Sequence, residues 1–211
     1  MIFATTSKGK IKQLKTLIGS KIKIESLSER GLNIDVDEDG KTCEENAIKK
    51  ATVIHKLTGE AVLADDSGLF IDYFDGWPGV YTHRFLPDST DEERNDAIIE
   101  KMQNVSDELR GASHICVLAF CDKNGLVRTY KGEVRCTIAH KQKGDNLFGF
   151  DPIALLPCGK TLAELTDNEK VNVNARGIAF RKLAEDIDTI KDLCWQIIIT
   201  IILFIYLYRV C

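Results

Sequence analysis

An adjacent pair of carboxylates is the first candidate for chemistry in this chain. Asp65 and Asp66 directly follow the apolar run 61–64. Two neighbouring carboxylates at the end of a buried strand are costly unless a positive charge compensates them. Mg²⁺ supplies such a charge, since it binds one or two protein carboxylates together with the phosphate oxygens of a substrate. The structural alternative is an Asp-Asp-Ser-Gly turn, in which all these residue types are common.

Glu38 and Glu45 complete this acidic set, and each also has a structural explanation. Thr42 stands three residues before Glu45, a spacing that predicts a capping box at the start of a helix. Glu38 lies in the acidic loop 35–39 and is equally explained as surface charge. Lys50, further along the same predicted helix, is equally explained as a solvated lysine.

A second candidate is the segment 5–10, Thr-Thr-Ser-Lys-Gly-Lys, at the junction of a predicted strand and helix. Backbone N–H groups, the positive end of a helix dipole and two ammonium groups at such a junction suit a phosphate. The spacing differs from that of a P-loop. The structural alternative is a polar helix cap with solvated lysines.

A third candidate is Phe148-Gly149-Phe150-Asp151, where two aromatic residues flank a glycine. Such a loop could stack on a planar base and read its edge, or it could be anchored in the core by its aromatic side chains. Lys170 and Arg176 follow on the last predicted helix. Their spacing places them about 600° apart around a helix axis, so they share a face only if the helix breaks near 172–174.

Composition narrows the class of protein. The 211 residues carry a formal net charge of −4, which argues against an extended nucleic-acid-binding surface. The seven cysteines form no CxxC pair, and the four histidines lack metal-ligand spacing. We therefore expect a reduced, cytoplasmic protein without a disulfide framework or a zinc site.

Apolar and amphipathic segments alternate, which predicts an α/β fold. The helices lie mainly toward the two ends with a long hairpin between them, which favours a mixed sheet. The predicted strands are 1–5, 21–25, 61–64, 69–74, 112–121 and 126–139, and the predicted helices are 8–18, 42–57, 90–103 and 166–186.

The two ends of the chain differ in character. The first residues are too few for a signal-peptide core and are typical of a strand. Residues 193–208 are almost wholly apolar. As a helix this run would span about 24 Å, less than the roughly 30 Å core of a bilayer. A membrane anchor, a segment packed on the protein or a partner, and a non-native end all remain open. We expect one domain over 1–190 and a tail of uncertain role over 191–211.

The order of the motifs is more specific than any one of them. Over about residues 1–186 the chain resembles the inosine triphosphate pyrophosphatase family, the XTP/dITP diphosphatases. The segments that carry the resemblance are 4–10, 45–51, 64–69, 76–84, 148–152, 160–165 and 170–177.

The resemblance implies a long central mixed sheet flanked by helices, with two lobes, an active site in the cleft between them, and a homodimer. It also implies Mg²⁺-dependent hydrolysis of deaminated purine nucleoside triphosphates, such as ITP, dITP and XTP, to the monophosphate and pyrophosphate. The expected role is to cleanse the nucleotide pool.

By the same resemblance, Glu38 and Asp66 would bind Mg²⁺, and Asp66 would orient or deprotonate the attacking water. Asp65 and Glu45 would support that site. The triphosphate would be held by 5–10 and the base by 148–151 and Arg176. The residues expected to contact the substrate are Thr5, Thr6, Ser7, Lys8, Gly9, Lys10, Lys50, Ser67, Phe148, Gly149, Phe150, Asp151, Lys170, Ala175 and Arg176.

The chain departs from the family pattern in three places. Thr6 and Ser7 replace a Gly-Asn pair, Ala175 replaces a histidine expected at the base, and Asn146-Leu147 replaces a Gly-Gly pair. These changes motivate two alternatives: a nucleotide-binding or sensing protein with weakened catalysis, and the same reaction on another modified nucleoside triphosphate. The apolar tail motivates a third, a membrane-tethered protein.

Overall fold

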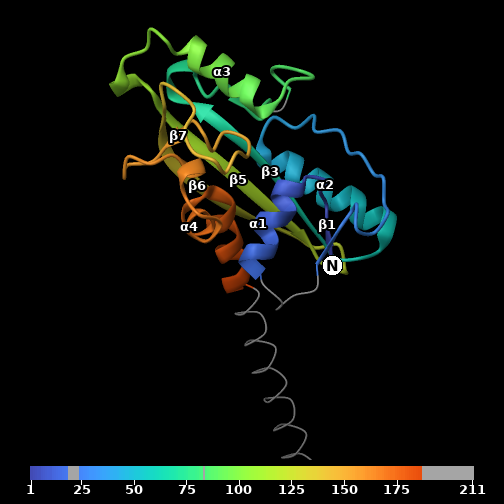
Figure 1. Ribbon diagram of the computed structural model, residues 1–211. Coiled ribbons are helices and arrows are strands. Elements are labelled where there is room, and N and C mark those ends of the chain that lie inside the picture. Colours follow the sequence, from blue (N-terminus) through green and yellow to red (C-terminus); the bar gives the residue numbers. More distant parts are fainter. Residues whose placement is uncertain (19–23, 83, 187–211) are drawn as a thin grey trace, which may run out of the picture.

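A computed structural model describes residues 1–18, 24–82 and 84–186 (Figure 1). Within these residues a seven-stranded sheet has the order β2-β1-β3-β5-β6-β7, and β4 pairs with β3. β1 is parallel to β2 and β3, and the later pairs are antiparallel, so the expected mixed sheet is confirmed. The strands are β1 (Ile2–Phe3), β2 (Glu25–Ser26), β3 (Val62–Ile71), β4 (Pro78–Gly79), β5 (Gly111–Cys121), β6 (Val127–Ile138) and β7 (Ala154–Leu155).

The helices begin at the polar residues that the sequence offers as caps. Thr90 and Thr166 form capping boxes with Glu93 and Glu169 at the starts of two predicted helices. At Thr42 only half of the predicted box forms, because the Glu45 carboxylate accepts from the Lys41 backbone N–H instead, at 2.6 Å. The helices are α1 (Lys8–Ile18), α2 (Cys43–Thr58), α3 (Asp91–Lys101), α4 (Asp167–Val173) and the helical stretch 175–186, with short 3₁₀ turns at Asp72–Phe74, Asp107–Leu109 and Leu162–Glu164.

Apolar clusters arrange these helices into two lobes. In the first, here the α2 lobe, α2 covers one face of β1, β3 and β5, while α1 and 175–186 cover the other. In the second, the α3 lobe, α3 packs on the far ends of β3, β5 and β6 together with the loop around Phe150. The long strands run through both lobes (Figure 1).

β3 corrects one expectation from the sequence. The segment 65–68 is not a turn between two strands but the middle of one continuous strand. It pairs with β5 without interruption from Val62↔Cys121 to Ile71↔Ala112. The strand continues because its two carboxylates find cationic and amide partners on either face of the sheet, as described below.

The last predicted helix is broken at Asn174, the place where the spacing of Lys170 and Arg176 required a break. Asn174 is extended (φ −78°, ψ 160°), and its Oδ1 accepts from the Gly177 N–H at 2.7 Å. Asn174 thus caps the stretch 175–186. A β-carbon at Gly177 would lie 1.7 Å from the Val171 carbonyl oxygen, so the junction requires glycine there.

Some predictions concern residues outside the described ranges. Residues 21–23 of one predicted strand, His83 of one motif and the apolar run 193–208 belong to them. The division into a domain over 1–190 and a tail therefore stays a prediction. Among the helices of the described residues, none combines the length and apolar character needed to cross a bilayer.

Candidate active site

The two central carboxylates point to opposite faces of the sheet. Successive side chains of a strand alternate in direction. Asp65 is paired with Leu118, which packs on the α1 face, and Asp66 with Val117, which packs on the α2 face. Each carboxylate therefore meets a different set of partners.

Asp65 is fully buried between two cations. Its Oδ1 lies 3.1 Å from Lys10 Nζ, and its Oδ2 accepts from Arg176 Nη2 at 2.9 Å and from Nε at 3.1 Å. Burial alone would raise the pKa of Asp65, but the charges of Lys10 and Arg176 outweigh it and hold the pKa well below its usual range. Asp65 therefore fixes Arg176, and it ties the start of α1 to the last helical stretch.

Asp66 is less well compensated. Its Oδ2 accepts from Asn46 Nδ2 at 3.0 Å, and its Oδ1 lies 3.9 Å from Lys50 Nζ. Lys50 Nζ also lies 2.5 Å from Glu38 Oε1. Burial raises the pKa of Asp66, and the Lys50 charge only partly opposes this. At Glu38 the same ammonium outweighs the effect of burial and lowers the pKa. Lys50 thus brings Glu38 and Asp66 together.

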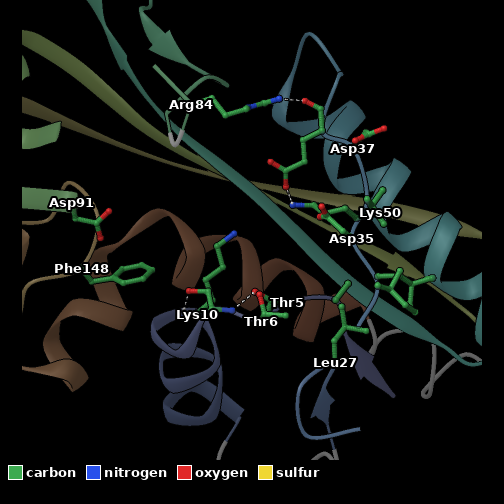
Figure 2. Close-up of a pocket in the computed structure, with 16 residues that line it drawn as sticks. Thr5, Thr6, Lys10, Leu27, Asp35, Asp37, Lys50, Arg84, Asp91 and Phe148 are labelled. Carbon is green, nitrogen blue, oxygen red and sulfur yellow. Dashed lines mark hydrogen bonds and ion pairs between the residues drawn. The ribbon is translucent and has the colours of Figure 1, made fainter. Parts of the chain in front are cut away.

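A cavity of about 540 Å³ opens beside this cluster (Figure 2). The α2 lobe contributes the strand–helix junction, the acidic loop and Lys50, and the α3 lobe contributes Arg84, Asp91 and Phe148. Figure 2 shows Lys10 extending from α1 into the space between Phe148 and Lys50. The full lining is Ala4, Thr5, Thr6, Ser7, Lys10, Leu27, Ile34, Asp35, Val36, Asp37, Glu38, Lys50, Ile54, Arg84, Asp91 and Phe148.

The predicted phosphate segment lies only partly on this cavity. Thr5, Thr6, Ser7 and Lys10 line it, and Thr5 Oγ1 accepts from the Ser7 N–H at 3.2 Å, which shapes the turn into α1. Lys8 is exposed and lies off the cavity wall. Gly9 also lies off the wall, under the ring of Phe148: a β-carbon there would be 2.2 Å from Phe148 Cε2.

The carboxylates suit a Mg²⁺ ion that arrives with a substrate. Glu38 and Asp66 both face the Lys50 ammonium group, Glu38 from the cavity wall and Asp66 from behind it. Within the described residues, no group of three or more His, Cys, Asp or Glu side chains forms a ready metal cage. Mg²⁺ does not need one, because one or two carboxylates with phosphate and water oxygens complete its octahedron. The raised pKa of Asp66 shows that nearby cations do not fully compensate its buried carboxylate, and a divalent ion would supply the missing positive charge.

A smaller cavity of about 30 Å³ continues from the larger one and shares Lys10, Asp91 and Phe148 with it. Phe148 lies between the two, with Arg176 Cζ 5.8 Å from its ring centroid. The remaining lining residues are Ser67, Gly68, Thr82, His114, Gly149, Phe150, Asp151 and Arg176.

Other residues predicted to contact the substrate lie deeper. Lys170 is buried and pairs with Asp151 at 2.8 Å, so its ammonium group borders neither cavity. Ala175 is fully buried in the core of the α2 lobe. Phe150 packs in the core of the α3 lobe and also borders the smaller cavity. Glu45 lines neither cavity, and its carboxylate accepts a hydrogen bond from the Lys41 backbone N–H. Their substrate roles stay predictions.

Three residues of the site were missed from the sequence. Arg84 lines the cavity and donates to the Glu38 carbonyl oxygen. Asn46 holds both Asp66 and the Gly40 N–H, the latter at 2.8 Å. Gln13 accepts from Arg176 Nη1 at 2.6 Å. Arg84 and Asn46 lie within motifs already singled out, whereas no local signal distinguishes Gln13.

Comparison with known proteins identifies the family. The sequence profile of the Ham1 family matches residues 1–186. The chain belongs to the Ham1 family. A relative from Clostridium perfringens, named dITP/XTP pyrophosphatase, is 38% identical over 195 residues, which cover 88% of this chain and 96% of that protein. One of the same name from Exiguobacterium sp. is 40% identical over 190 residues, covering 89% and 96%.

Solved structures of Ham1 proteins have the same fold. The Staphylococcus aureus Ham1 protein aligns with a TM-score of 0.80 at 32% identity, covering 89% of this chain and 97% of that one. A Coxiella burnetii HAM1 protein aligns with a TM-score of 0.79 at 34% identity, covering 89% and 98%. The resemblance drawn from the motifs and the fold class it implied are confirmed.

Proposed function

We propose that this Ham1 chain hydrolyses deaminated purine nucleoside triphosphates, such as dITP, XTP and ITP, to the monophosphate and pyrophosphate. The observation that carries the proposal is one cavity lined by Lys10, Lys50 and Glu38, with the buried Asp66 carboxylate behind its wall, 3.9 Å from Lys50 Nζ. The names of the relatives, dITP/XTP pyrophosphatase, support the same reaction.

The phosphate groups would lie at the junction of β1 and α1. The helix begins at Lys8, so its first N–H groups and its dipole face this end of the cavity. Lys10 and Lys50 both line the cavity and add ammonium charge. Phosphoryl transfer at such a site is chiefly positioning and charge stabilisation, with no covalent nucleophile required.

Glu38 and Asp66 would hold the metal. A bound Mg²⁺ supplies positive charge for the leaving pyrophosphate and lowers the pKa of a bound water. Asn46 fixes the orientation of the Asp66 carboxylate. Burial raises the pKa of Asp66, which makes it a better proton acceptor for the attacking water than an exposed aspartate. The neighbouring Asp65 forms an ion pair with Lys10.

The base would lie toward the smaller cavity, beyond the phosphate-binding end. Phe148 offers a ring for stacking, and the Gly149 backbone and Arg176 border the same space. Arg176 is already oriented by Asp65 and Gln13, so its remaining donor is held in a fixed direction. Fixed donors suit the 6-oxo group of a deaminated purine, and a 6-amino group would leave them unpaired.

We also infer that the protein works as a homodimer in the cytoplasm, as the family resemblance implies. The five free cysteines of the described residues, four of them buried, agree with a reducing compartment. Light scattering of the purified full-length chain measures the oligomeric state directly, and a monomeric mass at working concentration would contradict the dimer.

Pyrophosphate release from a panel of nucleoside triphosphates tests the reaction. We expect release from ITP, dITP and XTP that requires Mg²⁺, and a loss of roughly 100-fold or more in Asp66→Asn. Asp75→Asn is the matched control, because Asp75 is exposed, lies outside both cavities and has a left-handed backbone that asparagine tolerates. Binding of ITP without turnover would instead favour a sensing protein.

A further inference from the structure

The smaller cavity adjoins the larger one, and Glu38, one of the two proposed metal-binding carboxylates, lines only the larger one. Lys10, Asp91 and Phe148 border both cavities, so the two form one path that narrows at Phe148. At about 30 Å³ the inner part holds about one water molecule. A purine is larger than this space, so its entry requires the lining to move, and we expect the Phe148 ring, which narrows the path, to turn.

His114 forms part of the wall of this inner cavity. It lies on β5 opposite Leu69, and its side chain is partly buried. Neither ring nitrogen has a hydrogen-bond partner among the described residues. In contrast, His55 Nδ1 bonds the Glu60 carbonyl oxygen at 2.7 Å, and His140 Nε2 lies 2.6 Å from Asp107. His114 therefore has free hydrogen-bonding capacity directed at a space that a ligand can reach.

The imidazole of His114 is neutral at physiological pH. Burial, together with the charges of Arg176 and Lys10, lowers its pKa to about 4. A neutral imidazole carries one N–H donor and one unprotonated acceptor nitrogen. Because the neighbouring Arg176 and Lys10 are positive, the orientation that turns the acceptor nitrogen toward them is favoured. Those cations border the cavity, so the acceptor faces it.

We propose that His114 reads the base by accepting a hydrogen bond from the N1–H of a 6-oxopurine, next to the remaining donor that Arg176 presents to the 6-oxo group. This inference rests on the proposed function, since it assigns the purine to the inner cavity. It makes His114 a specificity-determining residue that touches the base and takes no part in the phosphate chemistry.

The pairing separates 6-oxopurines from adenine. Hypoxanthine and xanthine present an acceptor at position 6 beside an N1–H donor, which matches a donor from Arg176 and an acceptor from His114. Adenine presents the reverse, an amino donor beside an unprotonated N1. The amino donor of adenine would then face the Arg176 donor, and its N1 acceptor would face the His114 acceptor. Each unpaired buried group weakens binding.

Binding of the product monophosphates tests this without relying on turnover. Calorimetry would compare IMP, AMP and inorganic tripolyphosphate in the wild type, His114→Phe and His114→Gln. His114→Phe keeps a ring of similar size but removes the acceptor, so we expect IMP to bind about 10- to 100-fold more weakly. Tripolyphosphate should change by less than about twofold, since it does not use the acceptor, and AMP should bind no more weakly than to the wild type, since the acceptor that opposes adenine N1 is gone. His140→Phe, on the exposed partner of Asp107, controls for the substitution itself.

Three outcomes overturn the proposal: an unchanged IMP affinity in folded His114→Phe, an equal loss for tripolyphosphate, and no detectable IMP binding by the wild type. Partial recovery of IMP affinity in His114→Gln, whose side-chain oxygen restores an acceptor, supports it and excludes a purely structural effect. If the wild type hydrolyses no ITP but His114→Phe still loses IMP selectively, the base-reading role stands while the proposed reaction fails.

Discussion

At the scale of the residue, two adjacent aspartates occupy different electrostatic environments. Asp65 has two cations within hydrogen-bond distance, and its pKa is held low. Asp66 has one amide and a more distant ammonium, and its pKa is raised. The alternation of the strand produces this division, and on it we base a proposed structural task for Asp65 and a proposed chemical task for Asp66.

The two aspartates should therefore respond differently to the same substitution. Asp65→Asn leaves the buried Arg176 without its counter-ion, and we expect a loss of roughly 3–5 kcal/mol in the free energy of unfolding. Asp66→Asn keeps the Asn46 contact and removes a poorly compensated charge, so stability should change by no more than about 1 kcal/mol while pyrophosphate release is lost. Urea unfolding monitored by far-UV circular dichroism measures both values. Equal destabilisation by the two variants would contradict the division of roles.

The chemistry of single residues could be predicted from the sequence better than their partners. The segments of Lys10 and Asp66 indicate phosphate and metal binding, each with a structural alternative, and Lys50 received its role only through the family resemblance. Gln13 accepts from Arg176, which is more than a hundred residues away in the sequence. Lys170 pairs with Asp151, which is about twenty residues away. No local pattern encodes such pairs.

At the scale of the element, periodicity and caps predicted most helices and the long hairpin, but local composition gave the wrong result in β3. Asp-Asp-Ser-Gly is typical of a turn. The segment is a strand because β5 pairs with it along its whole length and because Lys10, Arg176 and Asn46 compensate its charges from distant segments. Tertiary contacts override the local preference here.

The break at Asn174 is the element that places Arg176 on Asp65. Asn174→Ala removes the side-chain cap on the Gly177 N–H, and we expect a loss of about 1 kcal/mol in the free energy of unfolding. Because alanine also favours a continuous helix, Arg176 should rotate away from Asp65, and the KM for ITP should rise about tenfold.

Asn174→Ser is the matched control for this prediction, since serine is also a good N-cap and keeps the break. It should retain most of the stability and the wild-type KM. If Asn174→Ala lowered stability but left the KM for ITP unchanged, the break would have no part in positioning Arg176.

At the scale of the whole molecule, the mixed sheet follows from the order of the predicted elements, whereas the two lobes and their cleft were foreseen only through the family resemblance. The reason is physical. The lobes are defined by which helix packs on which end of β3 and β5, and an amphipathic helix carries no information about the position along a strand that it will cover.

The long strands should make the two lobes unfold together. Ile98 on α3 and Ile54 on α2 are matched isoleucines, 0% and 1% exposed, in the cores of different lobes. Either Ile→Ala change should cost about 2–5 kcal/mol. Since β3 and β5 run through both cores, we expect a single unfolding transition in each variant.

In Ile98→Ala, hydrogen-exchange protection should then fall in α2 as much as in α3. Wild-type protection of α2 in that variant would instead mean that the α3 lobe opens alone. If the α3 lobe opens alone, the residues of the cleft would become ordered only when the nucleotide binds. If the continuous strands couple the two lobes, Lys10, Lys50 and Arg84 are held in place before the nucleotide binds.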